Sequence, residues 1–150
     1  MPPADRPRSI EALVPQRGPA LLLETVLDSS DESIVALGRV PFESPFLRAG
    51  MAPCFLGLEL MAQAAGAFDA LRRGRDEPSA RSEIGYLVGI RGARFDGRPL
   101  PAGERLRAEV RQIGGASPLA VHEGRVFLGS VACLSAVLST FRPGPARNVQ

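Results

Sequence analysis

The most apolar stretch of the chain lies between Phe55 and Leu71, where almost every residue is apolar or small and most favour a helix. Pro53 suits a first-turn position, the two arginines after Leu71 suit the negative end of a helix dipole, and Gly74 can end the helix. A helix that is apolar on most of its faces belongs in a protein core. We therefore predict one long buried helix over about residues 53–73.

Two segments before this helix have the composition of strands. They are Leu21–Leu27 and Ser33–Val40, and the polar residues between them predict a turn. Farther upstream, Ser9 can cap a short helix over Ile10–Leu13, which Pro15 would end.

The segments after the long helix predict a second group of strands. Turns rich in Gly and Pro, such as residues 96–103, separate Ile84–Phe95, Leu106–Ile113, Leu119–Phe127 and Val131–Phe141. Glycines 85, 89 and 92 predict bulges, or close approach of this backbone to the helix. Strands on both sides of a single helix indicate an α+β domain, with an antiparallel sheet of about five or six strands wrapped around the helix. Dimerisation would cover the edges of such a sheet.

The length of the chain predicts one domain. It has 150 residues, 45% of them hydrophobic, which is enough for a sizeable core. We place the domain at residues 9–142, after a flexible arm over 1–8 and before a flexible tail over 143–150. The charged and small residues 74–82 predict an exposed loop.

Charge and cysteine content narrow the possible functions. A net charge of +2 is too small to suggest a nucleic-acid-binding protein, although all 18 basic residues are Arg, which favours phosphate contacts. Cys54 and Cys133 have neither metal-site spacing nor a disulfide pattern. The N-terminus lacks an apolar signal segment, and Glu59 divides the best candidate for a membrane span. We expect a cytoplasmic protein without a metal or cofactor.

Glu59 is the one acidic residue that interrupts the apolar helix, and Gln63 follows it one turn later on the same face. A carboxylate inside a buried helix is costly unless it is paired or used in chemistry. Glu59 is therefore the first candidate for catalysis, and the alternative is an acid held for structure alone. Gln63 is placed to hold Glu59 or a substrate, or equally to satisfy a backbone group.

Three stretches of the chain resemble the hotdog-fold 3-hydroxyacyl-[acyl-carrier-protein] dehydratases. The first resembles the family's Leu-Pro-His-Arg-x-Pro and reads Val14-Pro15-Gln16-Arg17-Gly18-Pro19. The second resembles its Pro-Gly-Val-Leu and Glu-Ala-Met-Ala-Gln and reads Pro53-Cys54-Phe55-Leu56 and Glu59-Leu60-Met61-Ala62-Gln63. The third resembles its Tyr-Phe-Ala-Gly-Ile, Ala-Arg-Phe and Pro-Gly-Asp and reads Tyr86-Leu87-Val88-Gly89-Ile90, Ala93-Arg94-Phe95 and Pro101-Ala102-Gly103. The chain is most similar to the divergent predicted dehydratases of aryl polyene and related pigment pathways. The resemblance implies a hotdog fold.

The resemblance also implies a catalytic pair in which an acid on the helix works with a His across a dimer interface. That His lies 14 positions before the acid, at 59 − 14 = 45, where this chain has Pro45, and Phe46 matches the family's next residue. Gln16 replaces the His of the N-terminal motif. The only His in the chain, His122, lies on a late predicted strand, where we expect it to be exposed and non-catalytic. The chain therefore keeps the acid and lacks the expected histidine.

Dehydration of a 3-hydroxyacyl thioester removes a proton from C2 and a hydroxyl from C3, so it needs a base and an acid. The resemblance assigns Glu59 to this chemistry. It also assigns the backbone N–H of Cys54, at 45 + 9 = 54 near the helix N-terminus, to polarising the thioester oxygen. The Cys54 thiol is either inert or a nucleophile activated by the helix N-terminus.

The resemblance also implies a catalytic role for Gln63. The substrate-binding residues that it implies are Gln16, Phe46, Phe55 and Tyr86. Aromatic residues beside a buried helix are also ordinary core residues. Arg48 and Arg94 would contact an acidic acyl carrier protein, and a solvated charged surface is the alternative.

Three functions remain open at this point. The leading one is a dehydratase-like enzyme, a homodimer that forms trans-2-enoyl thioesters in fatty-acid or polyene biosynthesis without the usual His. The alternatives are a non-catalytic partner subunit that pairs with a His-bearing paralogue, and a hotdog acyl thioesterase that uses the helix carboxylate. The sequence leaves open the acyl chain length, an aromatic or aliphatic substrate, and carrier protein or coenzyme A.

Overall fold

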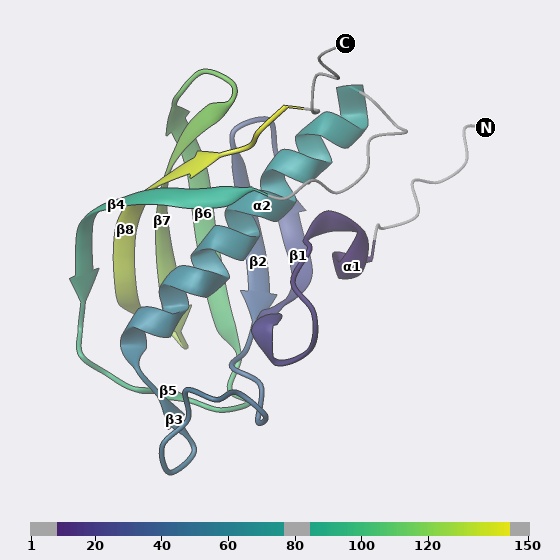
Figure 1. The fold of residues 1–150 in the computed structure, drawn as a ribbon. Coiled ribbons are helices and arrows are strands. Elements are labelled where there is room, and N and C mark those ends of the chain that lie inside the picture. The colour runs from purple at the N-terminus through teal and green to yellow at the C-terminus, as the bar shows by residue number, and fades with distance from the viewer. Residues whose placement is uncertain (1–8, 77–84, 145–150) are drawn as a thin grey trace.

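The fold is a curved antiparallel sheet wrapped around one long helix (Figure 1). A computed structural model describes residues 9–76 and 85–144. The arm predicted for residues 1–8, most of the predicted loop over 74–82 and most of the predicted tail lie outside the described residues. In chain order the elements are α1 (Ile10–Leu13), η1 (Gly18–Ala20), β1 (Leu23–Ser29), β2 (Ser33–Gly38), β3 (Met51–Ala52), η2 (Cys54–Leu56), α2 (Gly57–Asp76), β4 (Tyr86–Phe95), β5 (Leu100–Pro101), β6 (Leu106–Gly114), β7 (Leu119–Leu128) and β8 (Val131–Phe141).

The main sheet has six strands in the order β1-β2-β6-β7-β8-β4, and all neighbours in it are antiparallel. The α+β class, the antiparallel sheet and the single long helix are therefore confirmed. β6, β7 and β8 follow one another through short connections, whereas β4 pairs with β8 at the far edge. This order brings the start of β4 beside the end of β8, which matters for the site described below.

Two glycines allow α2 to lie directly on the sheet. A Cβ atom at Gly38 of β2 would lie 2.6 Å from Leu60 Cδ1, and one at Gly124 of β7 would lie 2.8 Å from Met61 Sδ. Because such contacts are too short, a larger residue at either position would displace these helix side chains, and at Gly38 it would also meet the carbonyl oxygen of Leu22. For glycines 85, 89 and 92 we expected either bulges or such a close approach. The register of β4 is irregular at Gly89 and around Gly92, so the bulges predicted there are confirmed, and no helix atom of the described residues lies within 4 Å of a Cβ built at either glycine.

The helix differs from its prediction at both ends. Its α-helical part begins at Gly57, after the two-residue strand β3 and the 3-10 turn η2, and Pro53 precedes that turn as its N-cap. At the other end α2 continues through Gly74 to Asp76. β3 pairs with β5, a short strand inside the segment predicted as a turn, so this small second sheet holds the chain just before the helix.

The short helix α1 has its predicted bounds, but the Ser9 side chain makes no capping hydrogen bond.

The long helix differs from expectation in another respect. By length and composition, Cys54–Gly74 is able to cross a membrane, although we expected Glu59 to exclude this. Most of this segment is buried inside the fold, as in the core helix of a compact domain.

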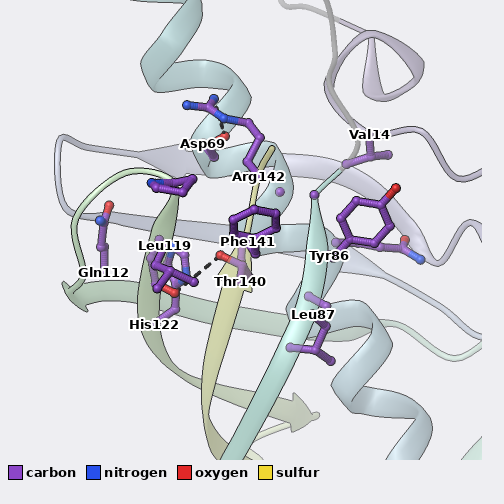
Figure 2. A pocket seen from close by; sticks show the side chains of 18 of the residues that line it. Val14, Asp69, Tyr86, Leu87, Gln112, Leu119, His122, Thr140, Phe141 and Arg142 are labelled. Atoms are coloured by element: carbon purple, nitrogen blue, oxygen red, sulfur yellow. Dashed lines mark hydrogen bonds and ion pairs between the residues drawn. The ribbon is translucent and has the colours of Figure 1, made fainter. Parts of the chain in front are cut away.

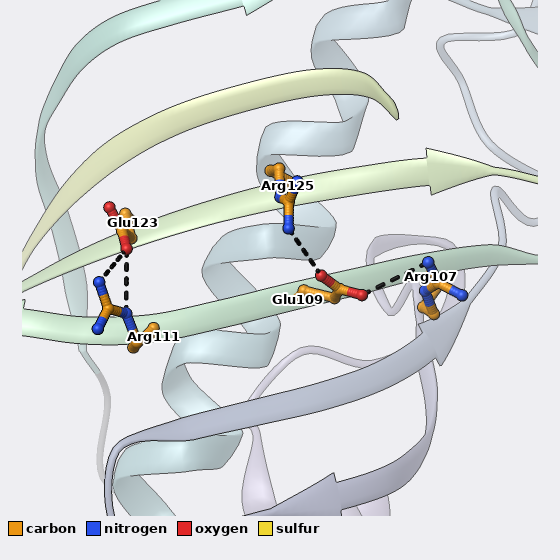
Figure 3. A network of polar contacts seen from close by, with 5 residues as sticks. All are labelled: Arg107, Glu109, Arg111, Glu123 and Arg125. Carbon is orange, nitrogen blue, oxygen red and sulfur yellow. Dashed lines mark hydrogen bonds and ion pairs between the residues drawn. The ribbon is translucent and has the colours of Figure 1, made fainter. Parts of the chain in front are cut away.

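The two surfaces of the sheet carry different chemistry. The face away from α2 carries alternating charges on β6 and β7 (Figure 3), where Glu109 forms ion pairs with Arg107 and Arg125, and Glu123 accepts hydrogen bonds from Arg111. Such exposed ion pairs contribute little to stability. The β4 edge is largely apolar in contrast. It exposes Tyr86, Leu87, Val88, Ile90 and Phe95, together with Arg91 and Arg94.

Candidate functional site

A groove of about 580 Å³ runs along α2, between that helix and the neighbouring ends of β4, β7 and β8, with the segment after α1 on its other side. Glu59, Gln63, Gln16 and Tyr86 all line it, so the fold brings together four of the residues predicted from the sequence. Figure 2 shows Tyr86 on β4 at one side of the groove. Phe141 at the end of β8, Arg142 just after it and His122 on β7 lie farther along.

Gln63 fixes the carboxylate of Glu59 and also joins the helix to the start of β1. Its Nε2 donates to Glu59 Oε1 at 3.0 Å and to the carbonyl oxygen of Ala20 at 2.7 Å. Its Oε1 accepts from the N–H groups of Leu22 and Leu23 at 2.9 and 3.0 Å. All hydrogen-bonding positions of this buried amide are therefore used. Glu59 itself is half-buried, with its carboxylate at the groove.

Cys54 lies at the first position of η2, outside the lining of the groove. Its buried Sγ donates to the carbonyl oxygen of Cys133 at 3.3 Å. Burial, followed by the negative charge of Asp96, raises the pKa of the Cys54 thiol. The burial and the raised pKa of this thiol favour the inert alternative over the nucleophile. The Cys54 N–H, as a first-position donor, has no intrahelical partner and no other partner in the described part of the chain, so the predicted oxyanion role stays a prediction.

Alkylation should test this assignment of the thiol. Because a buried thiol with a raised pKa forms little thiolate, we expect iodoacetamide at neutral pH to label Cys54 far more slowly in the native protein than in urea. Burial also raises the pKa of Cys133, to about 11, so both thiols should behave alike. Mass spectrometry of the digested protein measures each site. Rapid native labelling of Cys54 would contradict the structure.

His122 is buried rather than exposed, so that expectation was wrong. It lies on β7 with 2% of its surface exposed, and its ring stands edge-on to Phe68 at a centroid distance of 6.0 Å. Its Nδ1 has no hydrogen-bond partner in the described residues. Burial lowers the pKa of His122, Arg72 lowers it further, and Asp69 opposes the shift, so the imidazole is neutral at pH 7.

The lowered pKa of His122 predicts a stability that depends on pH. The unfolded chain binds a proton at about pH 6.5, whereas the folded chain binds it only at lower pH. Below about pH 6.5 the unfolded state therefore holds more protons, and the free energy of unfolding falls. We expect urea unfolding at pH 5.5 to show a smaller pH-dependent loss for His122→Leu than for the wild type. Equal losses in the two proteins would contradict this assignment.

Four other predicted residues lie outside the groove lining. Phe46 and Phe55 have 52% and 54% of their surfaces exposed, so they are not core residues of this chain. Arg48 and Arg94 are exposed as well, on the pre-helix segment and on β4. Their roles in substrate and carrier-protein binding stay predictions.

Gln16 does line the groove, and its Oε1 is buried without a partner among the described side chains and backbone.

The far half of the groove was missed by the sequence analysis. There Asp69 Oδ2 accepts from Arg73 and Arg142, each at 3.0 Å. The helix did carry a signal for it: polar or glycine residues at 59, 63, 66, 69 and 73 recur at intervals of three or four and so share one face. That polar face of an otherwise apolar helix faces the groove.

Comparison with known proteins agrees with this arrangement. The family model ApeP-like, described as ApeP dehydratase, matches residues 8–150. The chain belongs to the ApeP-like dehydratase family. It is 32% identical over 142 residues to the 3-hydroxyacyl-[acyl-carrier-protein] dehydratase FabZ of Shewanella loihica, an alignment that covers 90% of this chain and 91% of that protein. It is 37% identical over 107 residues to FabZ of Anaeromyxobacter dehalogenans, covering 67% of each chain.

A solved structure shares the fold closely. A chain of the dehydratase heterocomplex ApeI:P from Xenorhabdus doucetiae has a TM-score of 0.82 and 26% identity, and the match covers 93% of each chain. The hotdog fold and the resemblance to 3-hydroxyacyl-[acyl-carrier-protein] dehydratases are thereby confirmed. Within this ApeP-like family, the chain has the helix acid and has proline where the resemblance expects the loop histidine.

Proposed function

We propose that the protein is the acid-bearing subunit of a two-chain 3-hydroxyacyl-[acyl-carrier-protein] dehydratase. One observation supports this proposal most strongly: the groove holds the acid Glu59 without a histidine beside it to act as the base. Glu59 is held at the groove by Gln63, whereas the chain's only histidine, His122, is buried farther along the groove at the level of Asp69. Ten residues of α-helix, from 59 to 69, span about 15 Å. One proton-transfer group is thus in place, and the second must come from elsewhere.

The free edge of β4 supports an interface with another chain. β4 is ten residues long and pairs on one side only, with β8, among the described strands. A long, largely apolar strand that is paired on one side only is a template for pairing with a strand of another chain. The exposed Phe46 and Phe55 lie outside the groove lining and would also be covered by a partner. The dehydratase heterocomplex ApeI:P, which this chain resembles, favours a partner of a different sequence.

In the proposed reaction a histidine of the partner subunit takes the proton from C2 of the 3-hydroxyacyl thioester. The C2–H electron pair forms the C2=C3 double bond and the C3–O bond breaks. Glu59, protonated, gives its proton to the departing hydroxyl, which leaves as water. The Cys54 N–H is our candidate for polarising the thioester oxygen. A proton then returns from the imidazolium to Glu59, and the trans-2-enoyl thioester is released.

Reconstitution tests the proposal. The purified chain, a His-bearing dehydratase paralogue from the same genome, and an equimolar mixture of the two are each incubated with 3-hydroxyacyl and saturated acyl carrier-protein substrates. Mass spectrometry follows the products. We expect enoyl product from the mixture at a rate well above the sum of the separate proteins. Enoyl product from this chain alone at the full rate would contradict the two-chain proposal, and free acid from both substrates would indicate a thioesterase instead.

A further inference from the structure

Gly66 lies in the middle of α2 and lines the groove. It is exposed, whereas residues 57–65 and 67–71 of the same helix are buried or half-buried. A Gly inside a helix destabilises the helix relative to Ala, because Gly loses more conformational freedom on folding. The chain therefore has an unfavourable residue at this position, in a helix that otherwise consists largely of good helix formers.

Packing within the chain does not require this glycine. A Cβ atom built at Gly66 would have no atom of the described residues within 4 Å, and the backbone there is not in the left-handed region. Gly38 and Gly124 differ, since a Cβ atom at either would meet a helix side chain at less than 3 Å. At Gly66 a larger side chain would fit the fold, and it would narrow the groove instead.

Along the helix, the groove is polar at its two ends and apolar between them. Glu59 and Gln63 lie at one end, and Asp69 lies at the other with the arginines around it. Between Gln63 and Asp69 the helix contributes only Ala65 and Gly66 to the lining. This middle section suits an unbranched chain of carbon atoms without charges.

The proposed reaction sets the direction of such a chain. In that reaction C1 of the substrate lies at the Cys54 N–H, just before α2, and C3 lies at Glu59, in the first turn of α2. The carbon atoms after C3 then continue toward the C-terminal end of the helix. Gly66 is 66 − 59 = 7 residues from Glu59, which is about 10 Å along the helix. An extended chain covers that distance in about eight bonds, at about 1.2 Å each.

We propose that Gly66 is a specificity-determining residue that keeps the groove open for an unbranched acyl chain of about ten carbons or more. The proposal rests on the proposed function for the direction of the chain. The absent side chain at position 66 would then determine how long an acyl chain the protein binds, whereas Glu59 acts on C3 whatever the chain length.

Binding to the purified full chain tests the proposal without turnover. Calorimetry compares hexanoyl and dodecanoyl ligands, each joined to pantetheine through an amide in place of the thioester. Because the groove buries each methylene in part, about 2-fold tighter binding per methylene predicts about 60-fold tighter binding of the dodecanoyl ligand. In Gly66→Leu the new side chain covers the preceding turn and blocks the longer chain, so that ratio should fall below about 5-fold, with the affinity for the hexanoyl ligand unchanged.

Gly66→Ala is the matched control. Its methyl group has room and Ala favours the helix, so the melting temperature should rise and the ratio should stay within about 3-fold of wild type. A lower melting temperature would show that the fold itself needs this glycine, and would overturn the proposal. Gly66→Met replaces the Leu variant if the latter does not fold.

The remaining outcomes are also decisive. A wild-type ratio near one, or an unchanged ratio in a folded Gly66→Leu, would overturn the proposal. Equal weakening of both ligands would overturn it as well, and would assign Gly66 to the pantetheine arm that they share. Because binding needs no partner and no reaction, failure of the reconstitution experiment would leave the ratio intact.

Discussion

Replacing Glu59 with Gln is expected to lower the rate of 3-hydroxyacyl thioester dehydration by the reconstituted two-chain enzyme about 10²–10⁴-fold. The amide has nearly the same size, and its oxygen still accepts from Gln63 Nε2, which donates to Glu59 Oε1 in the structure. What it cannot do is exchange a proton with the departing hydroxyl. The loss should therefore appear in the rate of enoyl product under saturating substrate, with the melting temperature little changed.

A matched control for this variant is Glu123→Gln. Glu123 lies on the outer face of the sheet, where its carboxylate is exposed and pairs with Arg111 (Figure 3). The same chemical change there should leave the rate of dehydration within about twofold, because the pair is screened by solvent and lies outside the groove lining. A Glu59→Gln enzyme that keeps the wild-type rate would show that the acid is held for structure alone.

The second large effect is expected from Gln63→Leu, and it concerns stability. This change leaves the N–H groups of Leu22 and Leu23 and the carbonyl of Ala20 without their partner. Since each of the two buried N–H groups that loses its hydrogen bond costs about 1–3 kcal/mol, we expect the free energy of unfolding to fall by about 2–6 kcal/mol. Urea denaturation followed by circular dichroism measures the change.

Gln16→Leu is the corresponding control. Gln16 also borders the groove, but its Oε1 has no hydrogen-bond partner in the described residues. Its removal should therefore change the free energy of unfolding by less than about 1 kcal/mol. If Gln63→Leu lowers the free energy of unfolding no more than Gln16→Leu does, then the hydrogen bonds by which Gln63 joins the helix to β1 do not stabilise the fold.

The parts of the fold that the sequence predicted are those set by local composition. The long helix follows from its run of Ala, Leu and Met, and the strands follow from alternation between turns. The parts that it missed depend on contacts between distant segments. β3 and β5 have two residues each and exist because they pair with one another. The glycines that admit the helix, Gly38 and Gly124, are known only once the strand register places them under Leu60 and Met61.

The same division applies to the site. Glu59 and Gln63 are four positions apart on one helix, so periodicity alone placed them on one face. The far end of the groove combines β7, β8 and the start of β4, and only the strand order reveals that these segments meet. His122 was expected to be exposed because strand alternation alone does not tell which face packs on the helix. The missing loop histidine was visible in the sequence, since Pro45 occupies its position.

The most direct test of the two-chain account asks which chain supplies the acid. In the equimolar mixture, the helix carboxylate of the His-bearing partner is replaced by its amide while this chain is left unchanged, and the initial rate of enoyl product is measured. We predict nearly the full rate, because Glu59 of this chain supplies the proton and Pro45 leaves the other site without a base. The account would be contradicted if this change in the partner lowered the rate as far as Glu59→Gln does. It would also be contradicted if this change lowered the rate and Glu59→Gln did not.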